Sequence, residues 1–243
     1  MPIVGRRSPP PGMLWGVSDL RERWRSGWFE ATLYDVVVER ERVARPLARL
    51  IWGAQMSAFY AELARLAQEP DGSRILDVPC GGGVAFRGLR PDQHVHYVAA
   101  DLSTVMLGRA RQEAQRRRLS QVEFVEADVE GLPFDHESFD LCITYAGLHC
   151  FGDPAAAVGE FVRVLTPRGR LRGTSVVTGA GARYEALIGL AQRRSIFGEV
   201  LSASELESLL KRSGLEGVRV RLDGALVYFE ARRWGEDQGP TVT

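Results

Sequence analysis

The sequence predicts an α/β protein with a doubly wound, mostly parallel sheet, an antiparallel pair of strands at its end and a helical cap before it. Short apolar runs alternate with helix-like segments through the middle of the 243-residue chain. The first run leads into a glycine-rich turn, and Asp223-Gly224 separates the last two runs. Alternating strands and helices are typical of parallel sheets, and Asp-Gly between two strand-like runs is typical of a hairpin.

The first part of the chain is expected to be helical. Residues 1–12 are rich in proline and arginine and are predicted to form a disordered tail. In residues 13–70 apolar side chains recur at every third or fourth position, which indicates helices with one buried face. Turn residues at Pro70-Asp-Gly72 end this segment, which we interpret as a lid over a substrate site.

The sheet domain is expected to span residues 71–234, followed by a frayed tail at 235–243. Seven runs are predicted as strands: 74–79, 95–100, 122–127, 139–144, 170–177, 218–222 and 226–231. Helix-like segments lie at 83–90, 103–118, 154–165 and 202–212. Ser202, with Glu205 three residues later, has the pattern of a capping box and marks the start of the last helix.

The composition excludes several classes of protein. The chain has 31 Lys+Arg and 31 Asp+Glu residues, so a net charge of zero argues against dedicated binding of nucleic acid. Three cysteines without a CxxC pair favour neither a disulfide scaffold nor a zinc ribbon, and they fit a cytoplasmic protein. No apolar stretch approaches the roughly 18 residues of a membrane-spanning helix. The oligomeric state stays open between monomer and homodimer.

The strongest chemical signal is the run Ile75-Leu-Asp-Val-Pro-Cys-Gly-Gly-Gly83, in which a buried strand leads directly into glycines. Ligands bind beyond the carboxyl ends of parallel strands, where such a turn lies, although a tight turn without a ligand has the same pattern. Asp101 follows 18 residues after Gly83, at the end of the second strand. An acidic residue at this spacing accepts hydrogen bonds from ribose hydroxyls, and Ser103 can cap the next helix in place of Asp101.

The end of the third strand carries Asp128, whose ordinary role would be to start a turn. Three successive strand ends therefore hold the groups that a nucleotide-type cofactor needs. A nicotinamide-dependent dehydrogenase is disfavoured because Phe86 stands where the third glycine of G-x-G-x-x-G belongs. A P-loop enzyme is excluded because Lys211 is the only lysine and does not follow a glycine.

These motifs resemble those of the class I S-adenosylmethionine-dependent methyltransferases, in particular the small-molecule branch that includes ubiquinone and menaquinone biosynthesis enzymes. The matching segments are Ile75–Gly83, Ala100–Ser103 with Met106-Leu107, Ala127–Phe134 with Ser138–Asp140, and Val164–Arg170 as the turn before the fifth strand. Pro79 departs from the family, which has a glycine there. The resemblance implies a Rossmann-like seven-stranded sheet, S-adenosylmethionine as cofactor, and methyl transfer to a small planar or lipophilic metabolite such as a quinone, polyketide or lipid precursor.

The resemblance also implies roles for individual residues. The expected cofactor-binding residues are Asp77, Cys80, Gly81, Gly83, Asp101, Leu102, Asp128, Val129 and Tyr145. Among them Asp77 would orient the methionine ammonium, Asp101 would bind the ribose hydroxyls, and Asp128 would accept from the adenine amino group. Leu102 would pack on the adenine, and the Val129 amide would lie close to it.

The acceptor side is expected after the fourth strand, where Tyr145 and Ala146 would flank the sulfonium and Tyr145 and His149 are the candidate catalytic residues. His149 is either a general base or a structural residue over the cofactor. The predicted lid residues are Trp28, Phe29, Tyr34 and Tyr60, whose rings form either a pocket or part of the core, with Tyr184 and Phe197 completing the cover. No metal site is expected, because the remaining histidines, His94, His96 and His136, form no ligand set.

Two alternatives concern the reaction itself. A methyltransferase acting on nucleic acid usually carries an Asn/Asp-Pro-Pro-aromatic run after strand four, whereas this chain has Tyr145-Ala-Gly-Leu-His149. A catalytically silent protein that binds S-adenosylmethionine and has a regulatory or substrate-shaping role would carry identical cofactor motifs, and it stays open.

Overall fold

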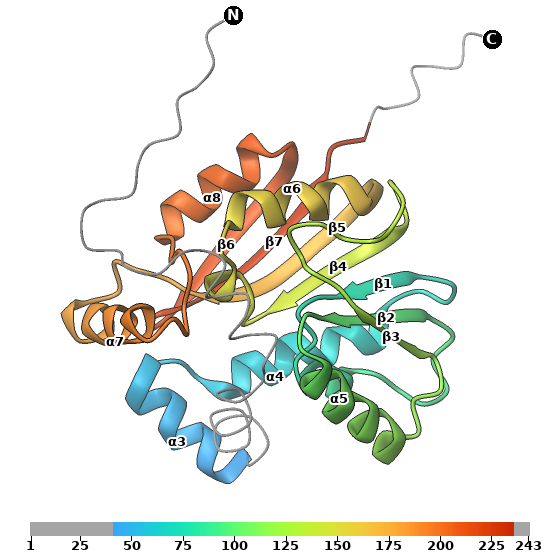
Figure 1. The fold of residues 1–243 in the computed structure, drawn as a ribbon, viewed down its shortest axis with the longest axis horizontal. Coiled ribbons are helices and arrows are strands. Elements are labelled where there is room, and N and C mark those ends of the chain that lie inside the picture. Colours follow the sequence, from blue (N-terminus) through green and yellow to red (C-terminus); the bar gives the residue numbers. More distant parts are fainter. Residues whose placement is uncertain (1–40, 236–243) are drawn as a thin grey trace, which may run out of the picture.

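The computed structural model describes residues 41–235, which form one sheet with helices on both faces (Figure 1). The predicted tail at 1–12, the lid residues Trp28, Phe29 and Tyr34, and the end of the chain from residue 236 lie outside the described residues. No helix among residues 41–235 has both the length and the apolar character needed to cross a membrane.

The sheet has seven strands in the order β3-β2-β1-β4-β5-β7-β6. The strands are β1 Arg74–Asp77, β2 His96–Asp101, β3 Val122–Glu126, β4 Phe139–Tyr145, β5 Leu165–Val176, β6 Leu215–Asp223 and β7 Leu226–Arg233. The first five run parallel, and β7 is antiparallel to both β5 and β6. This arrangement confirms the predicted doubly wound sheet with a C-terminal hairpin.

The α-helices are α3 Glu41–Trp52, α4 Met56–Ala64, α5 Thr104–Arg117, α6 Pro154–Val164, α7 Ala182–Arg193 and α8 Ala203–Arg212. Short 3-10 helices are η1 Arg65–Gln68, η2 Val84–Gly88 and η3 Leu148–Cys150. The predicted caps are present: the Met106 amide donates to Ser103 Oγ, and Ser202 with Glu205 forms a complete capping box. The sequence therefore marks the starts of α5 and α8 correctly.

Three elements differ from expectation. The segment Val164–Arg170, expected as a turn, lies mostly within β5, which begins at Leu165. The start of this strand is irregular, because Arg168 has φ 64° and the register with β4 shifts between Phe139 and Leu141. The predicted helix at 83–90 is only the 3-10 helix η2. Helix α7 was not predicted, because its sequence combines glycine, arginine and exposed leucines without a clear apolar face.

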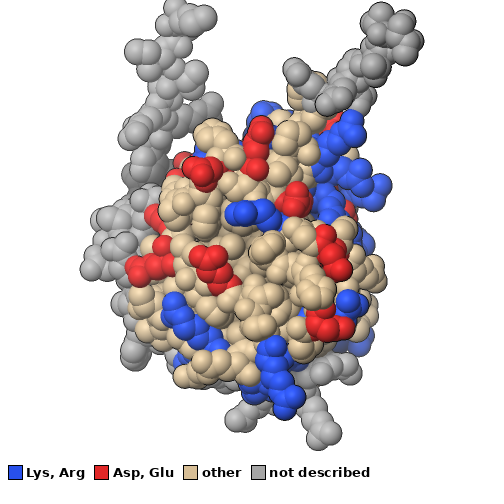
Figure 2. Space-filling view, turned by 90° about the vertical axis from the view of Figure 1, so that its right-hand side faces the viewer, with Lys and Arg blue, Asp and Glu red and all other residues tan. Residues whose placement is uncertain are grey.

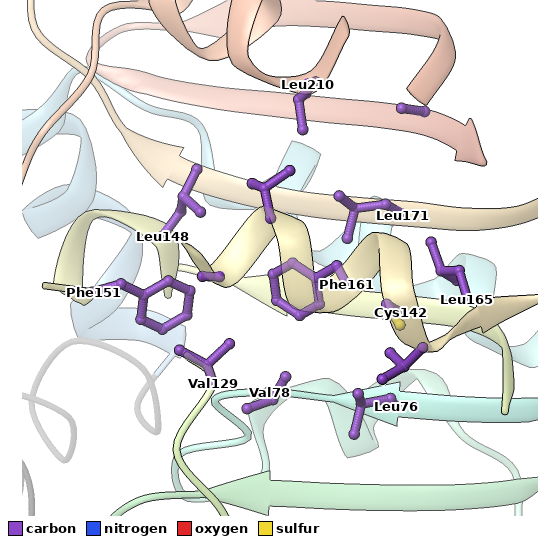
Figure 3. Close-up of a cluster of buried hydrophobic side chains, with 14 of the residues drawn as sticks. Leu76, Val78, Val129, Cys142, Leu148, Phe151, Phe161, Leu165, Leu171 and Leu210 are labelled. Carbon is purple, nitrogen blue, oxygen red and sulfur yellow. The ribbon is translucent and has the colours of Figure 1, made fainter. Parts of the chain in front are cut away.

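Apolar side chains fill both faces of the sheet, because alternate residues of each strand point to opposite sides. On one face Leu76, Cys142 and Leu171 of the strands pack with Phe161 of α6 and Leu210 of α8 (Figure 3). On the other face, Ile75, Tyr97 and Leu141 join residues of α4, η2 and α5. Helices on both faces leave the carboxyl ends of the strands as the place where loops converge.

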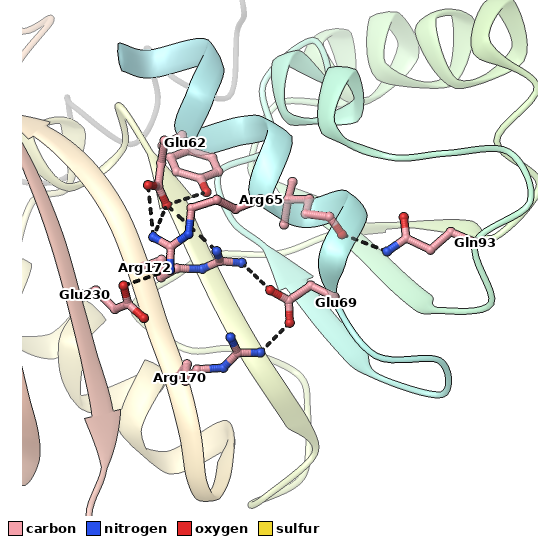
Figure 4. A network of polar contacts seen from close by, with 9 residues as sticks. Glu62, Arg65, Glu69, Gln93, Arg170, Arg172 and Glu230 are labelled. Atoms are coloured by element: carbon pink, nitrogen blue, oxygen red, sulfur yellow. Dashed lines mark hydrogen bonds and ion pairs between the residues drawn. The ribbon is translucent and has the colours of Figure 1, made fainter.

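The helical cap before the sheet is joined to it by buried charges (Figure 4). Glu69, just after η1, forms ion pairs with Arg170 and with Arg172, the latter at 2.6 Å. Arg172 is 1% exposed, although it lies in the middle of β5. On α4 and η1, Glu62 pairs with Arg65 at 3.1 Å, and Arg65 reaches Glu230 of β7 at 2.9 Å. A buried guanidinium requires partners of opposite charge, so this network fixes where the cap lies on the sheet.

We predict that Glu69→Ala destabilises the protein by about 3–5 kcal/mol, because it leaves the buried Arg172 guanidinium without its close carboxylate. Urea unfolding followed by circular dichroism measures this change. The matched control is Glu207→Ala, which removes the exposed Glu207–Lys211 pair of α8 and is expected to cost less than about 1 kcal/mol. Equal losses for the two variants would contradict the structural role of the Glu69 pairs.

Candidate functional site

The turn after β1 is held against the end of β2 by backbone and side-chain hydrogen bonds. The Cys80 amide donates to Ala100 O at 2.8 Å, and the Gly81 amide donates to Asp101 Oδ2 at 2.9 Å. Gly81 and Gly83 have positive φ of 53° and 88°, and a Cβ at Gly83 would lie 2.5 Å from the Phe86 ring. Glycine is therefore required at these positions for the backbone to make the turn.

Asp101 uses both carboxylate oxygens on backbone amides. Oδ1 accepts from Ser103 N at 2.8 Å, while Oδ2 accepts from Gly81 N. Ser103 caps the N-terminus of α5, as expected. Asp101 still accepts hydrogen bonds from the backbone and so connects the turn after β1 to the start of α5. Burial raises the pKa of Asp101 to about 6, although the amide hydrogen bonds oppose the shift.

Asp77 ends β1 in a fully buried position beside Asp101. Its Oδ2 accepts a hydrogen bond from the Tyr97 hydroxyl at 2.7 Å. The pKa of Asp77 is raised to about 8, because burial and the nearby Asp101 raise it by more than the Tyr97 hydrogen bond lowers it. Tyr97 was missed in the sequence, although a tyrosine within a buried strand needs a partner for its hydroxyl and so signals a polar neighbour.

The two carboxyl groups define the electrostatics of the site. Each is buried and has a raised pKa, so a positive charge nearby would favour their ionised forms. The described residues contain no group of three or more histidine, cysteine or acidic side chains that could hold a metal ion. The two buried carboxyl groups are therefore suited to a ligand that carries a positive charge.

The loop after β3 lies next to this turn. The Ala127 amide donates to Asp101 O at 3.1 Å, which holds the end of β3 to the end of β2. Asp128 Oδ1 accepts from the Glu130 amide at 3.0 Å, the geometry of an Asx turn. Val129 is buried and Leu102 half-buried. The structure thus brings the predicted residues on β1, β2 and β3 to one edge of the sheet.

The loop after β4 closes the same edge. Tyr145 is buried with its ring edge-on to Phe59 of α4, and its hydroxyl lies 3.5 Å from Glu62 Oε1. Burial raises the pKa of Tyr145 further above its usual value, so its hydroxyl stays protonated. Ala146 is exposed with φ 54°, and its amide donates to Thr174 Oγ1 at 2.9 Å. Glu62 was not predicted from the sequence.

Gly147 joins the loop after β4 to the turn after β1. A Cβ at Gly147 would collide with the ring of Pro79 and lie 2.6 Å from Thr144 Oγ1. Pro79, which follows a cis peptide bond from Val78, is the residue that departs from the family's glycine pattern. The absence of a side chain at Gly147 therefore allows these two loops to pack in contact.

His149 lies in an environment that does not fit a general base. Its Nδ1 accepts a hydrogen bond from the Val176 amide at 3.1 Å, so the neutral ring carries its proton on Nε2. The Phe197 ring packs edge-on, with the ring centroids 4.5 Å apart. Burial lowers the pKa of His149 to about 3. The hydrogen bond at Nδ1 and the burial of the ring favour the structural role over that of a general base, and the role of His149 stays a prediction.

The other predicted lid residues that the structure describes lie at different places. Tyr60 of α4 is half-buried, with the Arg87 guanidinium 5.5 Å from its ring centroid. Tyr184 of α7 is buried, and Phe197 lies between His149 and Trp52. Phe197 therefore packs against the loop after β4, where the sequence predicts the acceptor side of the site.

Residues 76–172 match a protein family described as "Methyltransferase domain". The demethylmenaquinone methyltransferase of Clavibacter sepedonicus is 43% identical over 103 residues, 41% of this chain and 40% of that protein. The phthiotriol/phenolphthiotriol dimycocerosates methyltransferase 1 of Mycobacterium ulcerans is 31% identical over 166 residues, 66% of this chain and 58% of that protein. The chain thus spans less than two thirds of the length of either relative.

The fold agrees with these likenesses. The solved structure of Haemonchus contortus phosphoethanolamine N-methyltransferase 2 in complex with S-adenosyl-L-methionine has a TM-score of 0.70 to this chain, at 16% identity. The superposition covers 91% of this chain and 60% of that one. Residues 76–172, which extend from the end of β1 into β5, are thus similar to a methyltransferase domain, and the turn after β1 lies near the start of the matched segment.

We predict that Gly147→Ala weakens binding of a ligand at this edge about tenfold or more, because a 1 Å misplacement of a site loop has effects of that size or larger. Calorimetric titration with S-adenosylhomocysteine measures the affinity. Gly108→Ala is the control, since a Cβ there meets nothing within 4 Å and alanine is the better helix former in α5. Unchanged binding by the folded Gly147→Ala protein would show that contact between the two loops is not needed.

Proposed function

We propose that this protein transfers the methyl group of S-adenosylmethionine to a small planar or lipophilic metabolite. The observation that carries the proposal is the pair of buried carboxyl groups, Asp77 and Asp101, beside the Cys80–Gly83 turn. S-adenosylmethionine bears positive charge on its ammonium and sulfonium groups and carries two ribose hydroxyls. Its chemistry therefore complements both the charge and the hydrogen-bonding capacity of this donor set.

The residues proposed to hold the cofactor come from the ends of three strands. Asp77 receives the ammonium end, Asp101 the ribose hydroxyls, and Asp128 with the Val129 amide the adenine, against which Leu102 packs. The backbone of Cys80, Gly81 and Gly83 lines the methionine portion, and Tyr145 borders the sulfonium. When bound, the cofactor supplies an activated methyl group open to direct displacement by a nucleophile.

The acceptor is proposed to lie between the loop after β4 and the helical cap. Tyr145, Phe59 and Phe197 line this side with aromatic rings, which suits a planar or lipophilic molecule. The names of the relatives, which refer to a menaquinone precursor and to mycobacterial lipids, support an acceptor of this kind. Acidic and basic side chains are interspersed on the face seen in Figure 2, which argues against a nucleic-acid substrate.

Catalysis is proposed to rest on proximity and on exclusion of water. Holding a nucleophile in line with the methyl group in an apolar pocket can itself account for a large part of the rate. His149 is assigned the role of a positioning residue, because its hydrogen bond with the Val176 amide fixes the loop after β4 on β5. Tyr145 keeps its proton and borders the site as a hydrogen-bond donor.

Calorimetric titration of the full chain with S-adenosylhomocysteine tests the cofactor assignment. We expect one site per chain, and a loss of affinity of at least about tenfold in Asp101→Ala, since a charge-assisted hydrogen bond is worth about 1.5–3 kcal/mol. Asp140→Ala is the control, because Asp140 accepts from the Arg74 amide at the opposite end of β1. Absence of binding by the folded wild-type protein, or equal affinities of wild type and Asp101→Ala, would refute the assignment.

The pH dependence of binding tests the role of Asp77. In the free protein its pKa of about 8 keeps the carboxyl largely protonated at pH 7. The ammonium group of the ligand, which S-adenosylhomocysteine keeps, lowers this pKa. Binding therefore releases a proton, and the affinity for S-adenosylhomocysteine rises as the pH rises from 6 to 8. Titration in buffers of different ionisation enthalpy counts the proton.

Two variants sharpen the pH prediction. Tyr97→Phe removes the hydrogen bond that lowers the pKa of Asp77, so the rise in affinity moves to higher pH. Asp77→Asn cannot ionise and leaves only the part of the pH dependence that comes from Asp101. A steep rise in affinity near pH 8 that persists in Asp77→Asn would assign the proton to another group.

A further inference from the structure

Helix α7 carries an outer surface that the proposed reaction does not use. Tyr184 and Ile188 form its buried face, whereas Leu187 and Leu190 are 38% and 47% exposed. Val105, Leu222, Trp234 and Leu50 are further large apolar side chains that are exposed among those whose burial the structure describes. Single exposed leucines are ordinary, but two that adjoin on one helix face call for an explanation.

Arginines lie at both ends of these leucines, although the Arg183 guanidinium packs over the Tyr184 ring, 4.3 Å from its centroid, and donates to the Tyr184 hydroxyl. Arg183, Leu187, Leu190 and Arg194 follow one another at intervals of three or four residues, and we call this set the α7 stripe. Arg193 and Arg194 form no ion pair with any acidic side chain that the structure describes. Glu185, the acidic residue of α7, lies on another side of the helix and its Oε1 accepts from the Gly179 amide at 2.6 Å.

A second helix presents similar residues at the same end of the molecule (Figure 1). Leu50 of α3 is 72% exposed, and Arg49 beside it is exposed as well. The end of α3 contacts the α7 region, since the Trp52 and Phe197 ring centroids are 6.1 Å apart and a Cβ at Gly53 would collide with the Tyr184 hydroxyl. Two neighbouring helices thus expose leucine together with arginine.

We propose that the α7 stripe, with the exposed end of α3, docks this protein on an anionic lipid surface. Helices that lie in a membrane interface combine an apolar strip with basic residues, because the apolar side chains enter the acyl boundary while arginines pair with the phosphates. Charge complementarity selects this occupant, since the exposed Arg193 and Arg194 at the end of the stripe, with no acidic residue along it, match a layer of negative head groups.

The docking surface also adjoins the proposed acceptor side. Phe197, which follows α7, packs on His149, and His149 belongs to the loop after β4. A lipophilic acceptor held in a bilayer would therefore lie close to the site when α7 rests on the membrane. This part of the inference rests on the proposed function, whereas the binding of vesicles does not.

Co-sedimentation of the full chain with vesicles tests the docking surface. We expect binding to mixed phosphatidylcholine–phosphatidylglycerol vesicles, and much weaker binding to phosphatidylcholine alone. Leu187→Gln with Leu190→Gln is expected to lower binding to the mixed vesicles about tenfold or more, because the interfacial apolar area is lost. Arg193→Gln with Arg194→Gln is expected to remove most of the preference for anionic lipid and its dependence on salt.

Val105→Gln is the matched control, since it removes an exposed apolar side chain from α5, outside the α7 stripe and the end of α3, and is expected to bind as wild type. Circular dichroism checks the fold of each variant, and glutamine is a good helix former. Failure of the wild type to bind anionic vesicles, or equal binding by the leucine variant, overturns the proposal. A stable dimer in sedimentation velocity that the leucine variant dissociates would assign the stripe to a second copy and also overturns it.

The same protein preparation is titrated with S-adenosylhomocysteine. Binding of the cofactor product without vesicle binding refutes docking and leaves the proposed function intact. Vesicle binding without binding of S-adenosylhomocysteine supports docking and refutes the proposed function.

Discussion

The candidate site of this protein depends on the Asp101 carboxylate, which accepts hydrogen bonds from two different segments. Asp101 holds the glycine turn after β1 through Gly81 and the start of α5 through Ser103, with one carboxylate oxygen for each amide. The loop after β3 is tied to the same residue through its backbone carbonyl. Three segments that are far apart in the sequence therefore take their positions from one residue. A site built in this way is already shaped before any ligand arrives, which lowers the entropy lost on binding.

A second constraint acts at the opposite side of the site. The cap helix α4 places Phe59 and Glu62 over Tyr145. The buried Glu69–Arg172 ion pair holds the end of the cap on β5, and the partly exposed Arg65–Glu230 pair holds it on β7 (Figure 4). The part of the chain proposed to enclose an acceptor is thus anchored by charge, while the part proposed to enclose the cofactor is anchored by hydrogen bonds to the backbone.

Much of the fold could be predicted because it depends on local patterns. The alternation of strands and helices, the glycine turn and the caps at Ser103 and Ser202 are all properties of short segments. The start of β5 was missed because Arg168 and Gly169 have turn chemistry, although the strand absorbs them as an irregularity. The setting of His149 and the pairing of Glu69 with Arg172 depend on contacts between residues distant in the sequence, which no local pattern contains. Trp28, Phe29 and Tyr34 lie outside the residues described here, so their predicted place in the lid stays a prediction.

The buried Arg172 has a consequence for engineering. A guanidinium stays charged at every pH that a protein survives, so a sheet that contains one in its interior cannot accept an arbitrary covering segment. A cap helix taken from a relative would have to bring carboxylates to the places of Glu62 and Glu69, or Arg172 would have to be replaced together with it. A grafted cap that is meant to change the acceptor must therefore match the charge of Arg172 as well as the shape of the pocket. Arg172 of β5 therefore restricts the covering segment to one that brings carboxylates within reach of its guanidinium.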